Sequence, residues 1–192
     1  MRMLPWSALL SASVIMLCGC ATAPLAPHDI SLDGKDERGV VVVSCSMRKD
    51  VTYVEPFLSR EPLNVTDFYI YATNKKSGML SLAGYLPVWS FASRSGDFGK
   101  EPLGRVYALR LKPGEYRFLR VEAGNLRGNI SPPRTFVVAA HSINYIGNIE
   151  LVATEVGKYR FDVKDMRSRD LPVFLKQYPN VTEEQVKSSI ME

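Results

Sequence analysis

The chain has 192 residues, the size of one domain, and 46% of them are apolar, which is enough to bury a sizeable core and excludes a disordered chain. Its 24 Lys and Arg residues against 20 Asp and Glu residues leave a formal net charge of +4. That excess is small and scattered along the chain, so it does not predict binding to nucleic acid.

The first 19 residues predict a signal peptide. Arg2 supplies a positive charge, and the residues from Leu4 to Leu17 are apolar or small apart from three serines. This run is shorter than the roughly 20 residues that a membrane-spanning helix needs, and no second run of spanning length follows. We therefore expect the chain to be exported and to be held at a membrane only by a covalent anchor.

The end of this run, Leu17-Cys18-Gly19-Cys20, resembles the lipobox of bacterial lipoproteins. The resemblance implies cleavage between Gly19 and Cys20 and attachment of diacylglycerol to Cys20. Cys18 departs from the Ala, Ser or Thr usual at its position. Ala21 follows where Asp would signal retention, which implies sorting to the outer membrane, facing the periplasm. Two or three acyl chains give stable anchoring, because each buried methylene contributes about 0.8 kcal/mol.

Two other interpretations of these residues stay open. Ala21-Thr22-Ala23 is an A-x-A site, and ordinary cleavage after Ala23 would release a soluble periplasmic protein. Cys18 and Cys20 could also form half of a metal or redox site. That site would lack a second ligand pair, because the rest of the chain offers one cysteine and two histidines.

Residues 20–38 are rich in Pro, small residues and charges and have no apolar period. This composition predicts an extended, rather stiff tether between the membrane and a folded domain. The acidic residues Asp33, Asp36 and Glu37 do not have the spacing of a calcium-binding EF-hand loop, so we interpret them as solvated.

From residue 39 onward, short β-type segments alternate with turn signals. Val40 to Cys45 is typical of a strand buried on both faces, in which Cys45 would be a small buried hydrophobe. Residues 65–73 form the next predicted strand. Residues 79–93 contain Pro87, which cannot donate to a central ladder, so they favour two short strands or one bent edge strand.

The clearest turn is Lys112-Pro113-Gly114-Glu115, with alternating apolar residues before and after it. Its Pro-Gly pair suits a type II turn, so we expect a hairpin over residues 107–118.

Three further strands are expected over residues 136–138, 144–151 and 158–164. In the second of these, Tyr145, Ile149 and Leu151 are expected to share one face. In the third, Tyr159, Phe161 and Val163 alternate with charged residues, as in a half-buried strand.

Seven or eight strands over residues 39–165, without a helical period, predict a mainly β domain. We expect an antiparallel β-sandwich of the immunoglobulin or prealbumin type. Parallel pairing is not expected, because the connections are too short for crossovers.

The tail, residues 166–192, changes to helical spacing. Leu171, Phe174, Leu175 and Tyr178 recur at helical intervals, interrupted at Pro172, which a helix tolerates in its first turn. Thr182-Glu183-Glu184-Gln185 matches a capping box. We expect two short helices packed on the sandwich through a set of apolar residues that includes Val181, Val186 and Ile190.

The segments LRLKPGEYRF, RTFVVAAHSINYIGNIEL and YRFDVKD, within residues 103–178, resemble a group of small bacterial lipoproteins. Their β-sandwiches are akin to transthyretin-like or carboxypeptidase-regulatory-like domains. The resemblance rests on the Pro-Gly-Glu-Tyr turn and the later Tyr-Ile-Gly strand, and it implies a fold without an established activity.

The residue patterns predict no enzyme. No nucleophile elbow, phosphate-binding loop or His-Glu-x-x-His motif is present. His28 lies in the tether and His141 in a turn, without a partner histidine at ligand spacing, so no metal or cofactor is expected. The carboxylate pairs Glu183-Glu184 and Asp162/Asp165 are explained by solvation or a helix dipole. A catalytic acid pair assembled from distant strands stays open.

Binding is the function that the sequence favours. We expect a non-catalytic, lipid-anchored outer-membrane protein that holds or assembles other envelope proteins, through an exposed sheet edge near Pro87. The alternative is a carbohydrate- or peptidoglycan-binding sandwich that uses coplanar aromatic residues. The candidates are Tyr69, Tyr71, Tyr85, Trp89 and Phe98, although aromatic residues in strands more often belong to a core.

Overall fold

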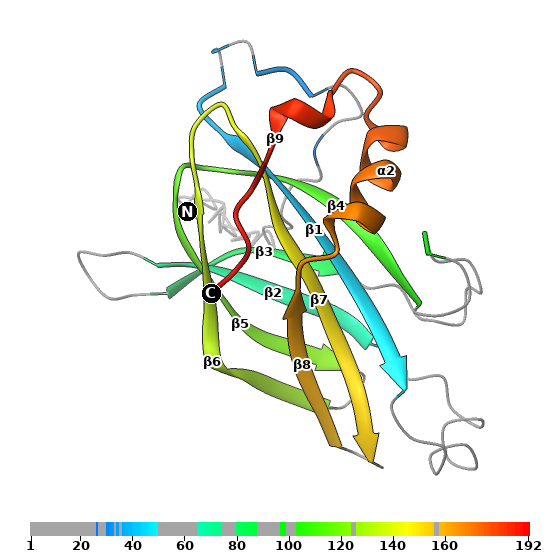
Figure 1. Ribbon diagram of the computed structural model, residues 1–192. Coiled ribbons are helices and arrows are strands. Elements are labelled where there is room, and N and C mark those ends of the chain that lie inside the picture. The colour runs from blue at the N-terminus through cyan, green and yellow to red at the C-terminus, as the bar shows by residue number, and fades with distance from the viewer. Residues whose placement is uncertain are drawn as a thin grey trace, which may run out of the picture.

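The computed structural model describes residues 26, 30–32, 34, 36–49, 65–73, 80–87, 97–98, 103–123, 126–155 and 158–192. This part of the chain is mainly β (Figure 1). The strands are β1 (Gly39–Lys49), β2 (Val65–Thr73), β3 (Leu80–Pro87), β4 (Leu103–Leu111), β5 (Gly114–Ala123), β6 (Leu126–Val138), β7 (Ile143–Glu155), β8 (Lys158–Lys164) and β9 (Val186–Ser188). Helix α2 spans Arg167–Gln177, and a 3-10 turn spans Glu183–Gln185.

Several predicted features lie outside the described residues: the signal peptide with Cys18, Gly19 and Cys20, the A-x-A site, His28, Asp33 and Trp89. Within the described part, no helix is long and apolar enough to cross a membrane.

The strands form two sheets with buried residues between them. The first sheet has the order β4-β1-β7-β8, with β9 beside the start of β7, and the second has the order β3-β2-β5-β6. One buried cluster takes Leu109 and Ile149 from the first sheet and Phe118 from the second. On the other face of the first sheet, Tyr145 packs in a second cluster with Phe174 of α2, which lies across that face (Figure 1).

The prediction that β1 is buried on both faces is confirmed. Val41 and Val43 belong to the cluster shared by the two sheets, while Val40 and Val42 belong to the cluster beneath α2. Cys45 faces the first of these clusters, and burial raises the pKa of its thiol. Cys45 is therefore a small buried hydrophobe that stays protonated.

The prediction that all strands pair antiparallel is wrong. β1 pairs with β4 antiparallel, but it pairs with β7 in parallel, and so does β9. A parallel pair needs a long connection between its strands. Here the chain between β1 and β7 supplies that connection by building β2, β3, β5 and β6 of the second sheet.

The predicted hairpin around Pro113 is also wrong. β4 pairs with β1 in the first sheet, whereas β5 pairs with β2 and β6 in the second, so the turn carries the chain from one sheet to the other. The Tyr116 hydroxyl donates to the Lys112 carbonyl at 2.7 Å, and its ring stacks on Phe136 at 5.4 Å. This is the geometry of a tyrosine corner, which fixes a crossing between sheets. In the motif Pro-Gly-Glu-Tyr, the hydrogen bond of Tyr116 therefore favours a crossing between the sheets over the hairpin predicted from Pro-Gly.

A bulge in β7 separates residues that the sequence predicted to share a face. Val42 pairs with Tyr145 and Ser44 pairs with Asn148, so β7 has two residues between these pairs where β1 has one. Gly147 accommodates the bulge with a φ of 109°, which other residues rarely adopt. As a result Tyr145 faces α2, while Ile149 and Leu151 face the second sheet.

The tail forms one α-helix and, after the predicted start at Thr182, one short 3-10 helix where two short helices were predicted. α2 begins at Arg167, so Pro172 lies in its second turn and not in its first. After it, the chain makes only a 3-10 turn, in which the Thr182 N–H donates to Gln185 Oε1 at 2.8 Å. Val186 then begins β9, because its backbone pairs with the start of β7. Val181 and Val186 are buried, as expected.

Candidate functional site

The first candidate is a cluster of polar side chains buried between the first sheet and α2. Asp170 of α2 is fully buried, and its Oδ2 accepts hydrogen bonds from the Tyr145 hydroxyl at 2.6 Å and from Ser44 Oγ. Its Oδ1 accepts from Arg169 Nε at 2.7 Å. Burial and the adjacent Asp170 raise the pKa of Tyr145, so its hydroxyl stays a neutral donor.

Arg169 completes this cluster. Its Nη2 donates to Asn148 Oδ1 at 3.1 Å, and Asn148 Nδ2 donates in turn to Ser46 Oγ at 3.0 Å. The guanidinium carbon lies 3.7 Å from the centre of the Phe98 ring, a cation–π contact. The β7 bulge is required, because it brings Asn148 to the same face as Tyr145.

The hydrogen bonds of the cluster hold α2 on the first sheet. Ser44 and Asn148 are 0% and 1% exposed, so a solute does not reach the hydroxyl of Ser44. The Asp170 carboxylate is paired with the Arg169 guanidinium, as a buried charge requires. Sequence reasoning missed this cluster because its members come from three elements. The one local signal was Arg169-Asp170 next to the buried Leu171.

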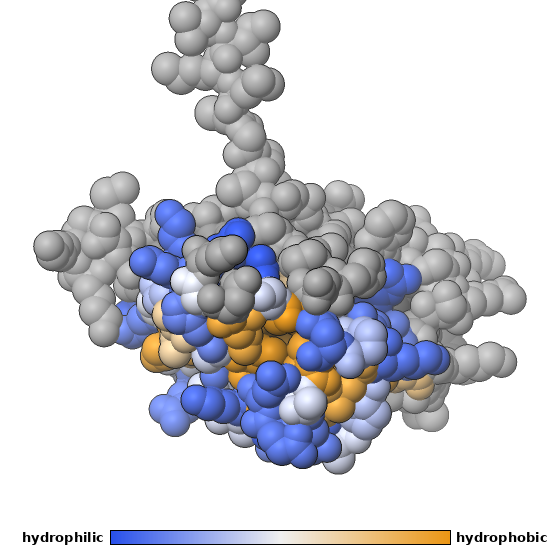
Figure 2. Space-filling view, turned by 90° about the horizontal axis from the view of Figure 1, so that it is seen from above, coloured by the Kyte–Doolittle hydropathy of each residue, from blue (hydrophilic) through white to orange (hydrophobic). Residues whose placement is uncertain are grey.

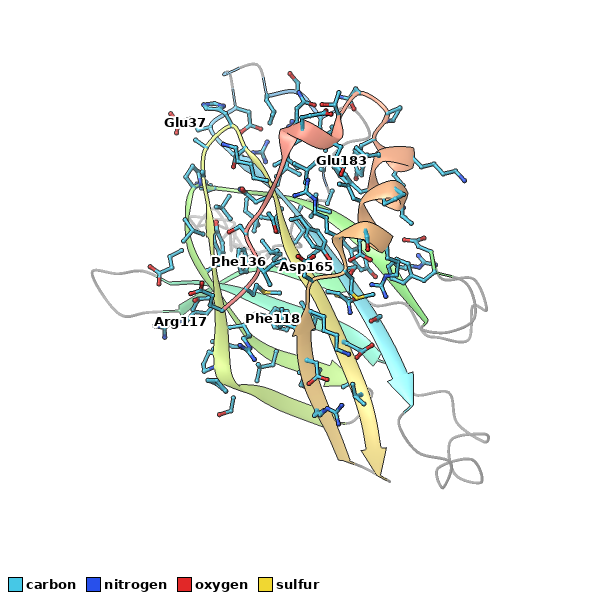
Figure 3. All side chains as sticks on the ribbon, viewed as in Figure 1. Glu37, Arg117, Phe118, Phe136, Asp165 and Glu183 are labelled. Atoms are coloured by element: carbon cyan, nitrogen blue, oxygen red, sulfur yellow. The ribbon has the colours of Figure 1, made fainter. Side chains whose placement is uncertain are left out.

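An open pocket of about 480 Å³ lies beside α2. Its lining comes from the end of β8, from α2 and from the 3-10 turn, and Figure 3 labels Asp165 and Glu183 on it. Two of its polar groups already have partners. The Arg167 guanidinium donates to the Val186 carbonyl at 2.9 Å, and Asp165 Oδ1 accepts from the Arg167 N–H at 3.0 Å.

The described end of the predicted tether is packed on the fold, so the prediction of a free tether over residues 20–38 is wrong there. Ala26 and Ile30 are 6% and 5% exposed and pack with Tyr178 and Val181. Seen from above, apolar residues gather in the middle of this end of the molecule, ringed by hydrophilic ones (Figure 2). Tethers rich in Pro and charge are usually solvated, but here three apolar positions meet the apolar face beside α2: Ala26, Ile30 and Leu32.

Hydrogen bonds fasten the same segment to the fold. The Ala26 N–H donates to the Ala108 carbonyl of β4 at 2.9 Å, and the Ala26 carbonyl accepts from the Tyr178 hydroxyl at 3.2 Å. Asn180 Nδ2 donates to the Ile30 carbonyl at 2.6 Å. Asp36 accepts from Arg38 and pairs with Arg110 at 3.1 Å. We call the described residues from Ala26 to Arg38 the N-terminal clamp.

The edges of the two sheets differ in what covers them. The outer side of β4 receives Ala26 of the N-terminal clamp. On β6, Thr135 and Glu192 exchange backbone hydrogen bonds of 2.8 and 3.2 Å. β8 has four charged residues among its seven, a pattern that discourages pairing with another strand. β3 pairs with β2 alone and has no backbone partner on its other side among the described residues. Either two short strands or one bent edge strand were predicted over residues 79–93, and β3 confirms an edge strand over Leu80–Pro87.

The outer face of the second sheet is defined by the register of its strands. Phe118 and Ile130 are buried in the core, and Arg117 is not, so Arg117 marks the opposite face (Figure 3). Tyr71 is the register partner of Arg117. Tyr69 pairs with Tyr85, so the three tyrosines occupy neighbouring register positions of β2 and β3.

The remaining predicted residues do not assemble into a reactive site. His141 is exposed in the turn between β6 and β7. Asp162 accepts from Arg160 at 3.2 Å, and hydrogen bonds at the 3-10 turn lower the pKa of Glu184. Within the described ranges, no three His, Cys, Asp or Glu side chains are grouped so that they could hold a metal ion.

Comparison with known proteins identifies no family. No family model matches the chain, and no curated protein matches it. Among solved structures it is similar to a leucine-rich repeat protein from Bacteroides thetaiotaomicron VPI-5482, with 17% identity and a TM-score of 0.29. The match covers 62% of this chain and 14% of that one, so the chain spans a small part of that protein.

Proposed function

We propose that the chain is a non-catalytic lipoprotein of the bacterial cell envelope. Acyl groups on Cys20 anchor it in the outer membrane, facing the periplasm, and its two sheets form a β-sandwich of the immunoglobulin or prealbumin type. The folded part binds other envelope proteins. The lipobox residues Leu17 to Cys20 support the anchor, and the arrangement of the sheet edges supports the binding role.

The observation that carries the binding proposal is the contrast between β3 and the other edges. An unpaired strand presents backbone N–H and C=O groups to which an extended peptide can add as a further strand. The chain itself contributes Ala26 to the β4 edge and Glu192 to the β6 edge, and β8 is charged. β3 is therefore the edge that best fits strand addition by a partner protein.

Site-specific photocrosslinking in cells tests this assignment. A photoreactive amino acid is placed at Ser81 or Ala83 of β3, with Arg160 or Asp162 of the charged β8 edge as the matched control. We expect one protein to be crosslinked from β3 and not from β8, and a synthetic peptide of that protein to compete for it. Equal crosslinking at both edges, or none from β3, would contradict the assignment.

A second function is favoured by the register of the second sheet. One row of register partners across β3, β2, β5 and β6 contains Tyr85, Tyr69, Arg120 and Asn129. A neighbouring row contains Tyr71, Arg117 and Thr135. Neighbouring strands are about 4.8 Å apart, so these positions lie close together in the sheet. Aromatic, guanidinium and amide groups together are the chemistry that recognises a carbohydrate, through its C–H faces and its hydroxyl groups.

The carbohydrate candidate has a direct test. Purified protein is incubated with peptidoglycan sacculi and with soluble glycans, and Tyr69→Ala and Tyr85→Ala are compared with Val137→Ala. Val137 is a suitable control because it is 60% exposed at β6 of the same sheet. Loss of at least tenfold in affinity for the tyrosine variants alone supports the candidate. Absence of binding by the unaltered protein excludes it.

A further inference from the structure

The N-terminal clamp changes how far the folded part can extend from an anchor at Cys20. If residues 20–38 were all free, the chain from Cys20 to Gly39 would reach about 65 Å at full extension. The clamp fixes the chain at Ala26, through the Ala108 and Tyr178 hydrogen bonds and through burial of Ala26 itself. Five residues, 21–25, then lie between the anchor and Ala26, which limits the reach to about 20 Å.

We propose that the N-terminal clamp holds one end of the folded part against the bilayer surface. This inference rests on the lipid attachment proposed above. The end concerned carries the clamp, the end of α2 and the 3-10 turn. This end faces the lipid headgroups, while the end of β7 and the start of β8, which lie at the opposite end of the fold in Figure 1, face away from the membrane.

The strand register gives the scale of this orientation. Ala26 bonds to Ala108, which lies in one row with Val42 and Tyr145. Arg160 pairs with Val152, which is seven residues beyond Tyr145 along β7. At about 3.3 Å per residue, Arg160 lies roughly 20 Å further along the sheet than the point where the clamp holds the chain. The two ends of the molecule are therefore distinguishable in their distance from a bilayer.

The clamp contacts come from residues that lie far from the proposed anchor in the sequence. Tyr178 and Asn180 follow α2, and Arg110 lies on β4, so the clamp joins three distant segments. Arg110 contributes in two ways, because Nη2 donates to the Ser31 carbonyl at 3.2 Å and Nη1 pairs with Asp36 at 3.1 Å. Removal of these donors releases the segment without changing the proposed lipidation sequence.

The test uses the lipidated full chain in phospholipid vesicles that contain a headgroup-labelled acceptor lipid. A donor dye is attached to a cysteine introduced as Glu184→Cys, near the clamp, or as Arg160→Cys, at the far end. Cys45 does not interfere, because it is buried in the core. We expect energy transfer from position 184 to be at least twofold more efficient than from position 160.

Two variants make the test specific to the clamp. The triple variant Arg110→Ala, Tyr178→Phe, Asn180→Ala releases the segment, and we expect the two efficiencies to converge. A second variant keeps the clamp and inserts 15 Gly and Ser residues after Ala23, which should also make them converge and does not threaten the fold. Equal transfer from both positions in the unaltered protein, or an unchanged difference in the spacer variant, would overturn the proposal.

Failure of the anchor and failure of the clamp give different results. Metabolic labelling with palmitate reports the anchor alone. Hydrogen exchange at the Ala26 amide reports the clamp alone, and we expect at least 100-fold slower exchange in the unaltered chain than in the triple variant. Labelled protein with an unprotected Ala26 amide contradicts the clamp while the anchor stands.

Discussion

Asp170 offers the sharpest test of how α2 is held on the first sheet. The substitution Asp170→Ala removes the acceptor of three side chains: Tyr145, Ser44 and Arg169. The Arg169 guanidinium is then left partly buried, with 21% of its side chain exposed, and without its carboxylate. Removal of one partner from a buried ion pair costs about 3–5 kcal/mol, so we expect a loss of that size in the free energy of unfolding.

The measurement is equilibrium unfolding in urea, followed by far-UV circular dichroism and by tyrosine fluorescence. Asp165→Ala is the matched control, because Asp165 also accepts a hydrogen bond at the start of α2 but is exposed. We expect the control to lose about 1 kcal/mol. A stability loss below 1 kcal/mol for Asp170→Ala, or one equal to the control, would refute the interpretation that this cluster fastens the helix.

A milder variant guards against complete unfolding. A domain of this size has a total stability of about 5–15 kcal/mol, so Asp170→Ala can consume much of it. Tyr145→Phe removes one hydroxyl that donates to Asp170 and accepts from the Met166 N–H at 3.1 Å. We expect it to cost about 1–2 kcal/mol and to be coupled to Asp170 in a double-mutant cycle.

Three more outcomes follow from the packing and the charges. Met191 is 4% exposed in the core between the sheets. In urea titrations, Met191→Ala should therefore lower the free energy of unfolding by about 2–4 kcal/mol. A loss under 1 kcal/mol would mean that the last residues pack loosely on the core. The Arg38 hydrogen bonds lower the pKa of Asp36 from 3.8 to about 2, so the contribution of Asp36 to stability is present above pH 4 and is lost as the pH falls from 4 towards 2. In Asp36→Asn, the unfolding midpoint should therefore depend less on pH between pH 4 and pH 2. An unchanged pH dependence would contradict the pairing of Asp36 with Arg38. Cys45 should not react with a thiol reagent at pH 8 in the folded protein and should react once in 6 M guanidinium, whereas rapid labelling of the folded chain would show that it is accessible.

The sequence predicts local strand character well because alternation and β-branching are local signals. The valines of β1 read as a strand buried on both faces, and Phe161 and Val163 of β8 are indeed half-buried against the core. Pro87 at the end of an edge strand follows from its missing N–H. These predictions depend on single residues and their immediate neighbours.

The errors concern which strands are partners. A Pro-Gly pair is compatible with a hairpin and with a crossing between sheets, and the bond from Tyr116 to Lys112 decides between them. The Gly147 bulge adds one residue to β7 and so breaks the period-2 pattern after Tyr145. The buried site was hidden for the same reason, because Ser44, Asn148 and Asp170 are separated by more than 20 residues and meet only in the folded chain. Non-local pairing of this kind leaves no local period.

The lipid anchor at Cys20 is the claim on which location and orientation both depend. Its most direct test is intact mass spectrometry and palmitate labelling of the protein and of Cys20→Ala, after separation of inner and outer membranes. We expect a chain that begins at Cys20, carries acyl groups and is found in the outer-membrane fraction, with no label in Cys20→Ala. Label that persists in Cys20→Ala, or an unacylated chain that begins after Ala23, would contradict it.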